Sequence, residues 1–457
     1  MLHDQPTSSD ALRASMEALL SLVESGEADP VRFERQVMGR LLAVGRGLMQ
    51  AKLESLSPAE DFAEQGVTWR VAVHSQLPMM TLFGDVAVKR PLFRAVRNGV
   101  TRCLVSERSG LVAGYWTQGA AKVVASAVAE MPMARAESFF ADIGLAPGSR
   151  SSMLRLAGAL SDLWEKDREA HEQAVREATP IPPEATTAAL SLDGVMVLMS
   201  DSDRVEKKAA AKARGYPDKG PAGFREASVG VVSFYDVEGN RLATRRYGRM
   251  PEADKATTKA WLARELAHLR KLRPDLVSVA IADGAANNWS FLSTLGADHE
   301  VVDFYHAVEH LQRHISIANG ASTVDTQALL RRMRLNLLHT PGAAARVFED
   351  MHRRRERAGT AALSTQKTSG KRQPTFFERH HGRMDYAILR SRNLPIGSGV
   401  TESTCKLTIC DRLRRTGMRW SQRGGQAIIT LRAHRVSDTF DQAWEVLMDA
   451  NAAQLAA

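Results

Sequence analysis

Three acidic residues stand in local sequences that suit metal-dependent chemistry. Asp193 lies within an apolar, β-branched run that predicts a buried strand, and Asp283 ends a second such run just before a glycine. Glu402 follows a Gly-Ser-Gly turn and opens a helical stretch. A carboxylate in a buried strand is costly unless it is compensated. Mg²⁺ is a common compensation, because it takes carboxylate oxygens together with substrate phosphates.

The three carboxylates would suit phosphodiester cleavage if they converge. Two divalent cations roughly 3.5–4 Å apart can activate a water and stabilise the leaving oxygen of an in-line displacement. We expect Asp193 to bridge two Mg²⁺ ions, Asp283 to bind one of them and Glu402 the other, with Mn²⁺ able to substitute. The freed 3′-hydroxyl could then attack target DNA at the same site. For each acid taken singly, the alternative is an ordinary surface or capping carboxylate.

The charge of the chain favours a polyanionic partner. Its 457 residues carry a net charge of +9. Residues 1–180 contain 20 Lys and Arg against 22 Asp and Glu, a net charge of −2. The remaining residues contain 41 against 30, a net charge of +11, so the basic excess accompanies the three acids. The alternative is that a basic chain is merely kept soluble by its charge.

Cysteine usage and hydropathy bound the class of protein. Cys103, Cys405 and Cys410 form no closely spaced pair, which argues against a zinc ribbon or a disulfide framework and favours a reducing compartment. We find no signal-peptide pattern and no apolar run that approaches a membrane span. A cytoplasmic protein with no membrane partner is the expectation.

The elements that must position the acids follow an α/β order. Strands are expected over about 189–199, 228–236, 240–248, 276–282 and 299–303. One helix is expected before the fourth strand, over about 252–271, and another before the fifth. Three antiparallel strands followed by strand, helix and strand is the order of a ribonuclease-H-like core, although order alone does not separate it from other α/β folds.

The flanking regions are expected to be mainly helical. Residues 1–60 form an N-terminal helical segment, and residues 61–180 a small extended segment followed by helices. Helices between Thr117 and Trp164 are compatible with a helix-turn-helix that binds DNA ends, or equally with a small helical bundle. The first part of the core then covers 185–303, a helical insertion 304–392, and the C-terminal part of the core 393–457.

Several further side chains are weaker candidates. Asp303 could fix the ring of His306, which could orient a phosphate; a structural histidine is the alternative. Two basic groups could neutralise DNA phosphates, or else be solvated surface. Their members are Lys207, Lys208, Lys212 and Arg214 in one glycine-containing loop, and Lys406, Arg412, Arg414, Arg415 and Arg419 on or just past the Glu402 helix.

Four ordered motifs resemble a known family. They are Leu192-Asp193-Gly-Val-Met-Val, Ala282-Asp283-Gly-Ala-Ala-Asn-Asn-Trp289, Val302-Asp303-Phe-Tyr-His306-Ala-Val-Glu-His310-Leu and Leu394-Pro-Ile-Gly-Ser-Gly-Val-Thr-Glu402-Ser-Thr-Cys-Lys406. Together they resemble the DDE transposases of bacterial insertion sequences. The run Arg415-Thr-Gly-Met-Arg-Trp420, followed by Gly424-Gly-Gln-Ala-Ile-Ile-Thr-Leu-Arg432-Ala, is similar to the ISKra-type group. The resemblance covers about residues 185–447.

The resemblance implies a ribonuclease-H-like catalytic core, interrupted by a helical insertion, that uses two divalent metals. It implies a nucleoid-associated bacterial enzyme that cuts insertion-sequence ends and joins them to target DNA, as a homodimer or higher oligomer. Family members often carry a cysteine-rich zinc element upstream, where this chain has only Cys103. Two other hypotheses remain open: a domesticated sequence-specific DNA-binding protein, and a structure-selective nuclease of the same fold.

Overall fold

The computed structural model describes the chain in segments and has a mixed α/β fold. The described residues are 8–24, 26–145, 148–200, 209–210, 212–215, 223–319, 324–357 and 376–456. They form two compact units. The first comprises Met1–Ala178, Gln426–Arg435 and Thr439–Ala457, and the second Thr179–Gly425 with Val436–Asp438. The units divide between Ala178 and Thr179, close to the boundary expected near residue 180.

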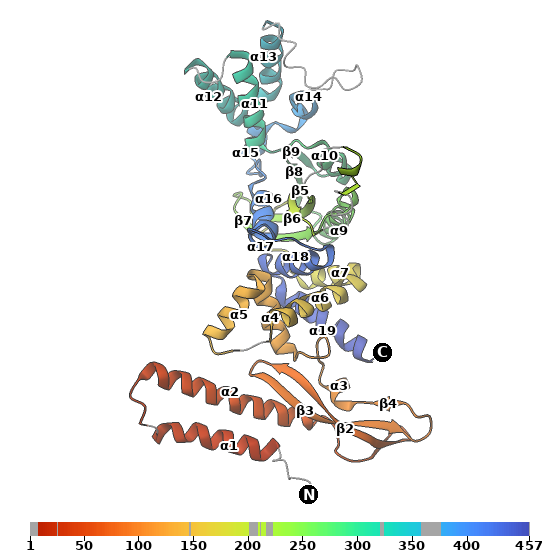
Figure 1. Cartoon of the computed structure of the whole chain (residues 1–457). Coiled ribbons are helices and arrows are strands. Elements are labelled where there is room, and N and C mark those ends of the chain that lie inside the picture. Colours follow the sequence, from red (N-terminus) through yellow and green to blue (C-terminus); the bar gives the residue numbers. More distant parts are fainter. Residues whose placement is uncertain are drawn as a thin grey trace. The chain divides into compact units, whose positions relative to one another are not determined.

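The first unit joins a helical hairpin, an antiparallel sheet and a helical bundle (Figure 1). The hairpin is α1 (Ser8–Leu20) and α2 (Pro30–Glu54), with a short 3₁₀ turn, η1 (Ser21–Glu24), between them. The sheet has the order β1-β2-β3-β4. Its strands are β1 (Phe62–Glu64), β2 (Val67–Thr81), β3 (Gly84–Ala95) and β4 (Thr101–Arg102). This sheet confirms the extended segment that the sequence predicts in this region.

Two breaks divide the helices between Thr117 and Trp164. Pro132 separates α4 from α5, and the residues around Gly144 to Gly148 precede α6, whose N-cap Ser149 accepts a hydrogen bond from the Ser152 N–H. The helices are α3 (Leu104–Arg108), α4 (Gln118–Glu130), α5 (Met133–Asp142), α6 (Arg150–Lys166), α7 (Arg168–Ala178), most of α18 (Gln422–Val436) and α19 (Phe440–Ala456).

The C-terminal end of residues 393–457, which the sequence assigns to the core, divides between the two units. Residues 426–435 and 439–457 belong to the first unit. Side chains of α18 form hydrogen bonds and an aromatic contact with α4 and α6 of that unit. The Arg432 guanidinium donates to the Ala129 carbonyl and the Glu130 carboxylate, and the His434 ring packs edge-on against Trp164 at 4.9 Å between centroids.

The second unit is built on a five-stranded sheet of order β7-β6-β5-β8-β9. β5 pairs antiparallel with β6 and parallel with β8; β6 and β7 are antiparallel, and β8 and β9 parallel. The strands are β5 (Thr187–Leu198), β6 (Phe224–Tyr235), β7 (Arg241–Arg249), β8 (Val277–Ala282) and β9 (His299–Val302). All five expected strands are confirmed, with bounds shifted by a few residues.

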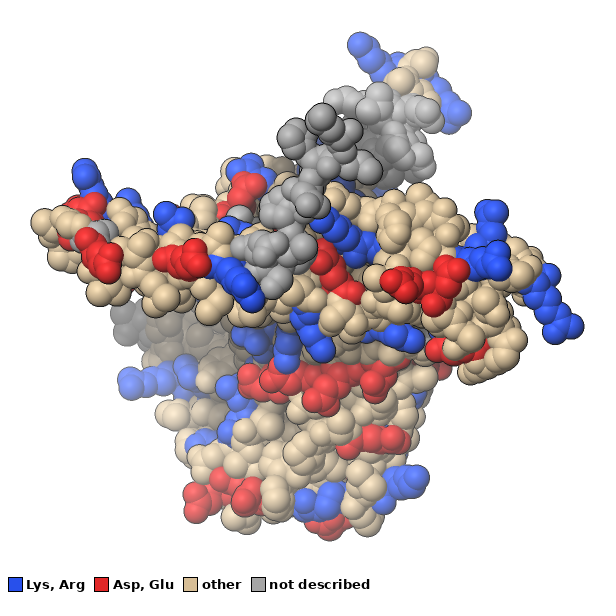
Figure 2. Space-filling model, turned by 90° about the horizontal axis from the view of Figure 1, so that it is seen from below, with Lys and Arg blue, Asp and Glu red and all other residues tan. Residues whose placement is uncertain are grey.

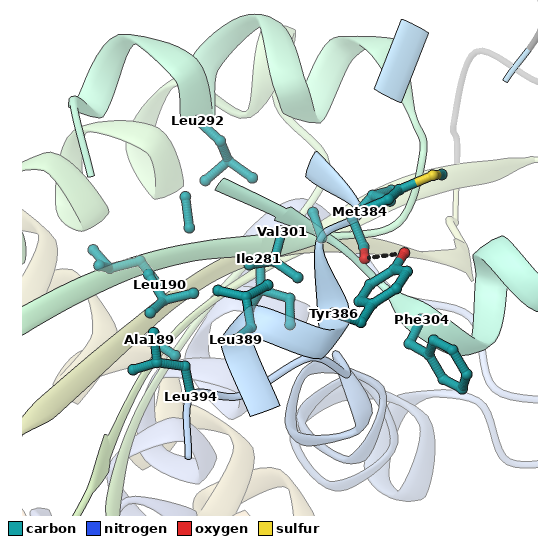
Figure 3. Packing of buried hydrophobic residues seen from close by; sticks show 14 of the residues in the cluster. Ala189, Leu190, Ile281, Leu292, Val301, Phe304, Met384, Tyr386, Leu389 and Leu394 are labelled. Carbon is teal, nitrogen blue, oxygen red and sulfur yellow. Dashed lines mark hydrogen bonds between the residues drawn. The ribbon is translucent and has the colours of Figure 1, made fainter. Parts of the chain in front are cut away.

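Helices cover both faces of this sheet. On one face, a side chain at Gly230 would meet Thr258 and Trp261, so α9 (Ala256–Leu272) lies against the strand centre there. The 3₁₀ turn η2 (Ala253–Lys255) precedes α9 in the connection from β7 to β8. The short helix α10 (Ala286–Leu292) and the 3₁₀ turn η3 (Ser293–Leu295) connect β8 to β9. On the other face, Leu389 and Leu394 pack near Ala189, Ile281 and Val301 (Figure 3).

The region between β9 and the Glu402 helix is helical where it is described, as predicted. The Tyr386 hydroxyl donates to the Val302 carbonyl at 3.0 Å, which ties the end of this region to β9. Its elements are α11 (Phe304–Asn319), α12 (Val324–His339), α13 (Ala343–Arg357), α14 (Phe376–His380), η5 (His381–Arg383) and α15 (Tyr386–Ser391).

One long helical segment changes its hydrogen-bonding pattern midway. It runs as α16 (Gly399–Thr404), a π-helical turn η6 (Cys405–Cys410) and α17 (Asp411–Leu413). Its buried side chains recur every four residues: Thr401, Thr404, Cys405, Thr408, Ile409, Arg412 and Leu413. π-helical turns are rare and are often found at functional sites.

Surface and hydropathy add two observations. On the face drawn in Figure 2, Lys and Arg side chains are interspersed with Asp and Glu side chains, so the two signs of charge are mixed there. None of the described helices combines the length and the apolar character that crossing a membrane requires.

Candidate active site

Asp193 lies on the central strand β5, where its charge is partly removed from water. Its Oδ1 accepts a hydrogen bond from the Gly194 N–H at 2.7 Å, and its Oδ2 accepts one from the Cys405 thiol at 3.5 Å. Burial raises the pKa of the Asp193 carboxyl; the Gly194 N–H opposes this effect, and the negative charge of Asp283 adds to it. The ionised carboxylate is therefore disfavoured unless a cation approaches it.

Asp283 directly follows β8, which is the parallel neighbour of β5. Its Oδ1 accepts hydrogen bonds from the Ala285 N–H and the Asn288 amide, each at 3.2 Å. The Trp289 indole donates to the Asp283 carbonyl at 2.5 Å. No described residue donates a hydrogen bond to Asp283 Oδ2, so this oxygen is left for another partner.

Strand register explains why the acids meet on one face. Side chains alternate along a strand, so Asp193 shares its face with Ala189. Ala189 pairs with Val279, and Ile281 pairs with Val301. Asp283 follows two residues after Ile281, and Asp303 two residues after Val301, which continues the same alternation to the strand ends. The negative charge of Asp283 contributes to the raised pKa of Asp193, which agrees with this placing of the two carboxylates.

Glu402 lies on the helix that covers this same face. The Thr401 hydroxyl donates to the Ser191 hydroxyl at 2.7 Å, and Cys405 contacts Asp193. These contacts place α16 over the acidic face of the sheet. Glu402 itself is exposed, and its carboxylate has neither a hydrogen bond nor an ion pair within the described part of the chain.

The donor set fits an open Mg²⁺ site more closely than a closed metal cage. Among the described residues, no group of three or more His, Cys, Asp and Glu side chains is arranged to hold a metal ion. Two neighbouring carboxylates, with one oxygen of Asp283 open, nevertheless match Mg²⁺, which keeps several waters and often binds one or two carboxylates plus phosphate. Asp193 and Asp283 would hold such an ion, and the covering helix carries a further carboxylate, Glu402.

Asp303 and His306 form the pair that the sequence predicts, and Asp303 has a second role. Its Oδ1 accepts from the His306 backbone N–H at 2.8 Å and from the ring Nδ1–H at 3.1 Å. Its Oδ2 accepts from the Ser398 backbone N–H and from the Ser398 hydroxyl. Ser398 directly precedes α16, so Asp303 anchors the start of the helix that carries Glu402.

The protonation of this pair is strongly biased. Burial alone would raise the pKa of Asp303, but the hydrogen bonds from His306 and Ser398 outweigh it and lower the pKa to about 2. The hydrogen bond to Asp303 raises the pKa of His306 to about 9 against the effect of burial, and the charge of Asp283 contributes. His306 is therefore an imidazolium near Asp283 at neutral pH.

Sequence reasoning missed a buried lysine and an asparagine beside Asp283. The Lys255 side chain is 9% exposed; its ammonium forms an ion pair with Glu226 at 3.0 Å and donates to the Asn288 side-chain oxygen, Oδ1, at 3.2 Å. Asn288 is part of the motif that contains Asp283, so its position five residues after the acid was an available signal. Lys255 belongs to no motif, and nothing in its local sequence distinguishes it from a surface lysine.

The end of the helical insertion closes over the loop after Asp283. A side chain at Gly284 would lie 2.1 Å from the Phe376 ring, which therefore packs directly on the backbone there. The His380 Nε2–H donates to the Gly284 carbonyl at 3.2 Å, and burial lowers the pKa of His380 to about 4. The Arg383 guanidinium lies over the Trp289 ring at 4.3 Å. This loop is held by aromatic packing that depends on the fold and that the sequence does not reveal.

The predicted DNA-contacting residues divide by burial. Arg412 is a correction: it is 1% exposed and lies over the Trp420 ring, because the four-residue spacing of the α16–α17 segment turns it inward. Arg415 is half-buried, and its Nε–H donates to the Asp411 carbonyl at 2.7 Å. The exposed members are Lys406, Arg414, Arg419, Lys212 and Arg214. Lys207 and Lys208 lie outside the described residues.

Comparison with protein-family models found no match, and a search of curated proteins found none either.

Proposed function

We propose that this protein is a DNA transposase of the DDE type, as its motifs suggest, that cleaves insertion-sequence ends and transfers them into target DNA. The observation that carries the proposal is the placing of Asp193 and Asp283. They follow or lie on neighbouring strands of one sheet, and Asp193 is half-buried, with a pKa that this burial raises. The helix that bears Glu402 covers the same face through the Thr401–Ser191 contact. The strand order and directions of the second unit are those expected of a ribonuclease-H-like core.

The chain's own residues have separable roles in this proposal. Asp193, Asp283 and Glu402 would hold the divalent cations, which when bound supply an activated water and stabilise the leaving 3′-oxygen. The His306 imidazolium, fixed by Asp303, would bind a phosphate oxygen near Asp283. The Cys405 thiol, whose pKa burial raises, stays protonated and orients the Asp193 carboxylate.

Recognition of the DNA would be divided between the two units. Lys406, Arg414 and Arg419 are exposed on the segment after Glu402 and would neutralise phosphates of the bound end. Helices α4 to α6 of the first unit would read the terminal sequence. A homodimer or higher oligomer on the DNA, associated with the bacterial nucleoid, completes the proposal.

The test is nicking of DNA that carries the inverted repeats flanking the gene, in Mg²⁺ or Mn²⁺. We expect the wild-type chain to nick at the repeat ends and Asp193→Asn to lose at least about 10³-fold in rate, because several kcal/mol of transition-state stabilisation depend on the metal. Binding to the ends in a gel-shift assay should survive, since the substitution removes no phosphate contact.

Other outcomes identify other functions. Specific binding by the wild-type chain without nicking, in either metal, would favour a domesticated DNA-binding protein. Nicking that follows branched or flapped structure and ignores the repeats would favour a structure-selective nuclease. Equal loss of binding and nicking in Asp193→Asn would contradict the assignment of Asp193 to the metal.

A further inference from the structure

Lys255 occupies an unusual position in the second unit. It directly precedes α9, and both it and Asp254 adopt left-handed backbone conformations, with φ of 53° and 54°. Such conformations are costly for residues other than glycine and persist only where surrounding contacts enforce them. The side chain is buried although it carries an ammonium, and burying a charge is tolerated only with close partners.

The partners of Lys255 form a chain that ends at Asp283. The ammonium contacts the Glu226 carboxylate at 3.0 Å and the Asn288 Oδ1 at 3.2 Å. The Asn288 Nδ2–H then donates to Asp283 Oδ1, also at 3.2 Å. Asn288 is only 2% exposed, so water has little access to replace either bond.

The chemistry of the two groups fixes the direction of this chain. An ammonium has three donors and no acceptor, so the carbonyl end of the Asn288 amide must face Lys255. The NH₂ end must then face Asp283, where it can only donate. With Oδ1 receiving this bond and the Ala285 N–H, Asp283 presents its other oxygen, Oδ2, to the site.

We propose that Lys255 is a positioning residue of the metal site, which acts through the Asn288 amide to set the orientation of the Asp283 carboxylate. This inference rests on the proposed function, because it assumes that Asp193 and Asp283 bind a divalent cation. Lys255 also lies close enough for its positive charge to act on Asp193, where it opposes the pKa increase caused by burial.

The electrostatic effect and the positioning effect of Lys255 can be told apart, because removing Lys255 would change the metal affinity in opposite directions. A cation beside a metal site repels the metal, so its removal should tighten metal binding if its role is only electrostatic. If Lys255 orients Asp283, its removal should weaken metal binding. Loss of such an outer partner costs metal affinity by 10–100-fold, as an order of magnitude.

The experiment measures Mn²⁺ binding to the full-length chain without DNA, from the free-Mn²⁺ signal in electron paramagnetic resonance. The variants are Lys255→Met, Asn288→Ala and the double variant. Lys259→Met is the matched control: Lys259 lies on α9, which Lys255 directly precedes, and pairs with Asp254 at 2.6 Å, but forms no hydrogen bond with Asn288. Asp193→Asn identifies the binding that belongs to this site.

We expect Lys255→Met and Asn288→Ala each to weaken the Asp193-dependent binding by about 10–100-fold. The Mn²⁺ affinity of the double variant should lie within about twofold of that of the weaker-binding single variant, because both residues act through one chain of bonds. Lys259→Met should stay within about twofold of wild type. If Lys255→Met does not fold by circular dichroism, Lys255→Gln takes its place, because it also removes the ammonium but keeps a polar side chain.

Unchanged or tighter binding in Lys255→Met would overturn the positioning role while leaving the metal site intact. Multiplying losses in the double variant would overturn it also, since the two residues would then act independently. A wild-type chain without Asp193-dependent Mn²⁺ binding would instead overturn the proposed function itself.

Discussion

The two sides of the candidate site are prepared to very different degrees. On the sheet side, every acidic group is held by donors: Asp193 by Gly194 and Cys405, and Asp283 by Ala285 and Asn288. On the helix side, Glu402 is exposed and unpaired within the described residues. The sheet therefore presents carboxylates already oriented and partly desolvated, whereas the helix presents one that is still solvated.

In the proposed metal site, this difference would separate two costs of binding a cation. Desolvation of Asp193, and orientation of Asp193 and Asp283 by their donors, are built into the fold. For Glu402 both would be deferred until a cation or DNA binds. A site arranged in this way would bind metal weakly alone and more tightly with substrate phosphate, which is common for Mg²⁺ enzymes.

The largest expected effect comes from comparing Glu402→Gln with Asp193→Asn. Both should lower metal-dependent cleavage by at least about 10³-fold, because each would remove a metal ligand. Their effects on metal-free stability should differ. Glu402→Gln should change the free energy of unfolding by less than about 0.5 kcal/mol, as exposed substitutions usually do. Asp193→Asn should raise the melting temperature at pH 8, because it removes a charge that burial disfavours.

The pH dependence of this stability gives a control. Because the folded-state pKa of Asp193 lies above its unfolded value, folding is favoured more when the carboxyl is protonated. The melting temperature of Asp193→Asn should therefore exceed that of wild type by less as pH falls through that raised pKa. Mg²⁺ should also reduce this difference at pH 8, because it would stabilise the ionised carboxylate of the wild type. Melting curves at several pH values measure both. A destabilised Asp193→Asn would contradict the picture of a strained carboxylate.

A smaller effect is expected at Asp303, the acid that stabilises the fold. Its pKa of about 2, against 3.8 for the free group, corresponds to about 2 kcal/mol of stability. That contribution is present above the unfolded pKa and is lost as pH falls through about 2. Asp303→Asn should therefore lower the free energy of urea unfolding at neutral pH by about 2 kcal/mol.

Asp275→Asn is the matched control, because the Asp275 carboxylate is exposed and its pair with Arg273 should contribute little. The His306 ring provides a second readout. By nuclear magnetic resonance, its pKa should fall from about 9 toward 6.5 in Asp303→Asn. The stabilisation from charged His306 is complete below about pH 6.5 and is lost as pH rises through about 9. An unchanged His306 titration would mean that Asp303 is not its counter-ion.

The smallest effect is expected at the arginines after Glu402. It tests whether exposed arginines contribute to DNA binding and buried ones do not. Replacing Arg414 and Arg415 by glutamine should weaken DNA binding on all sequences alike and flatten its salt dependence by roughly one slope unit per lost phosphate contact. Arg415→Gln alone should contribute less, since its guanidinium already bonds the Asp411 carbonyl. Salt titrations on repeat and random duplexes measure this.

Arg412→Met provides the contrast, because Arg412 is buried over Trp420. It should lower stability and leave the salt slope unchanged. A slope change in Arg412→Met, or a loss confined to repeat DNA in the Arg414 and Arg415 variant, would contradict the division by exposure.

The sequence predicted the core well where local patterns decide structure. The strands around Asp193 and Asp283 are long apolar runs, so their existence and order follow from hydropathy and turns. The Asp303–His306 contact was also predictable, because three residues separate neighbours on one helical turn. Whether these acids act on DNA stays a prediction.

What the sequence did not predict depends on contacts between distant segments. Lys255, which bonds Asn288, lies in a pair of successive residues with left-handed backbone, and no hydropathy pattern signals such a turn. The packing of Phe376 on Gly284 joins residues more than ninety positions apart. Residues 439–457 leave the core because their helix packs on the early helices, and only the fold decides which apolar faces meet.

The π-helical turn at Cys405–Cys410 determines in which direction the side chains after Glu402 point around the helix axis. Side chains spaced four residues apart drift by about 40° per turn around an α-helix, and so by about 120° from Thr401 to Leu413. One extra residue in a π turn offsets about 100° of this drift, which keeps Cys405 against Asp193 and Arg412 inward on a single segment. Deleting one residue of this turn would rotate Arg412, Arg414 and Arg415 by about 100° around the helix axis relative to Glu402, although each of these side chains would remain in the sequence.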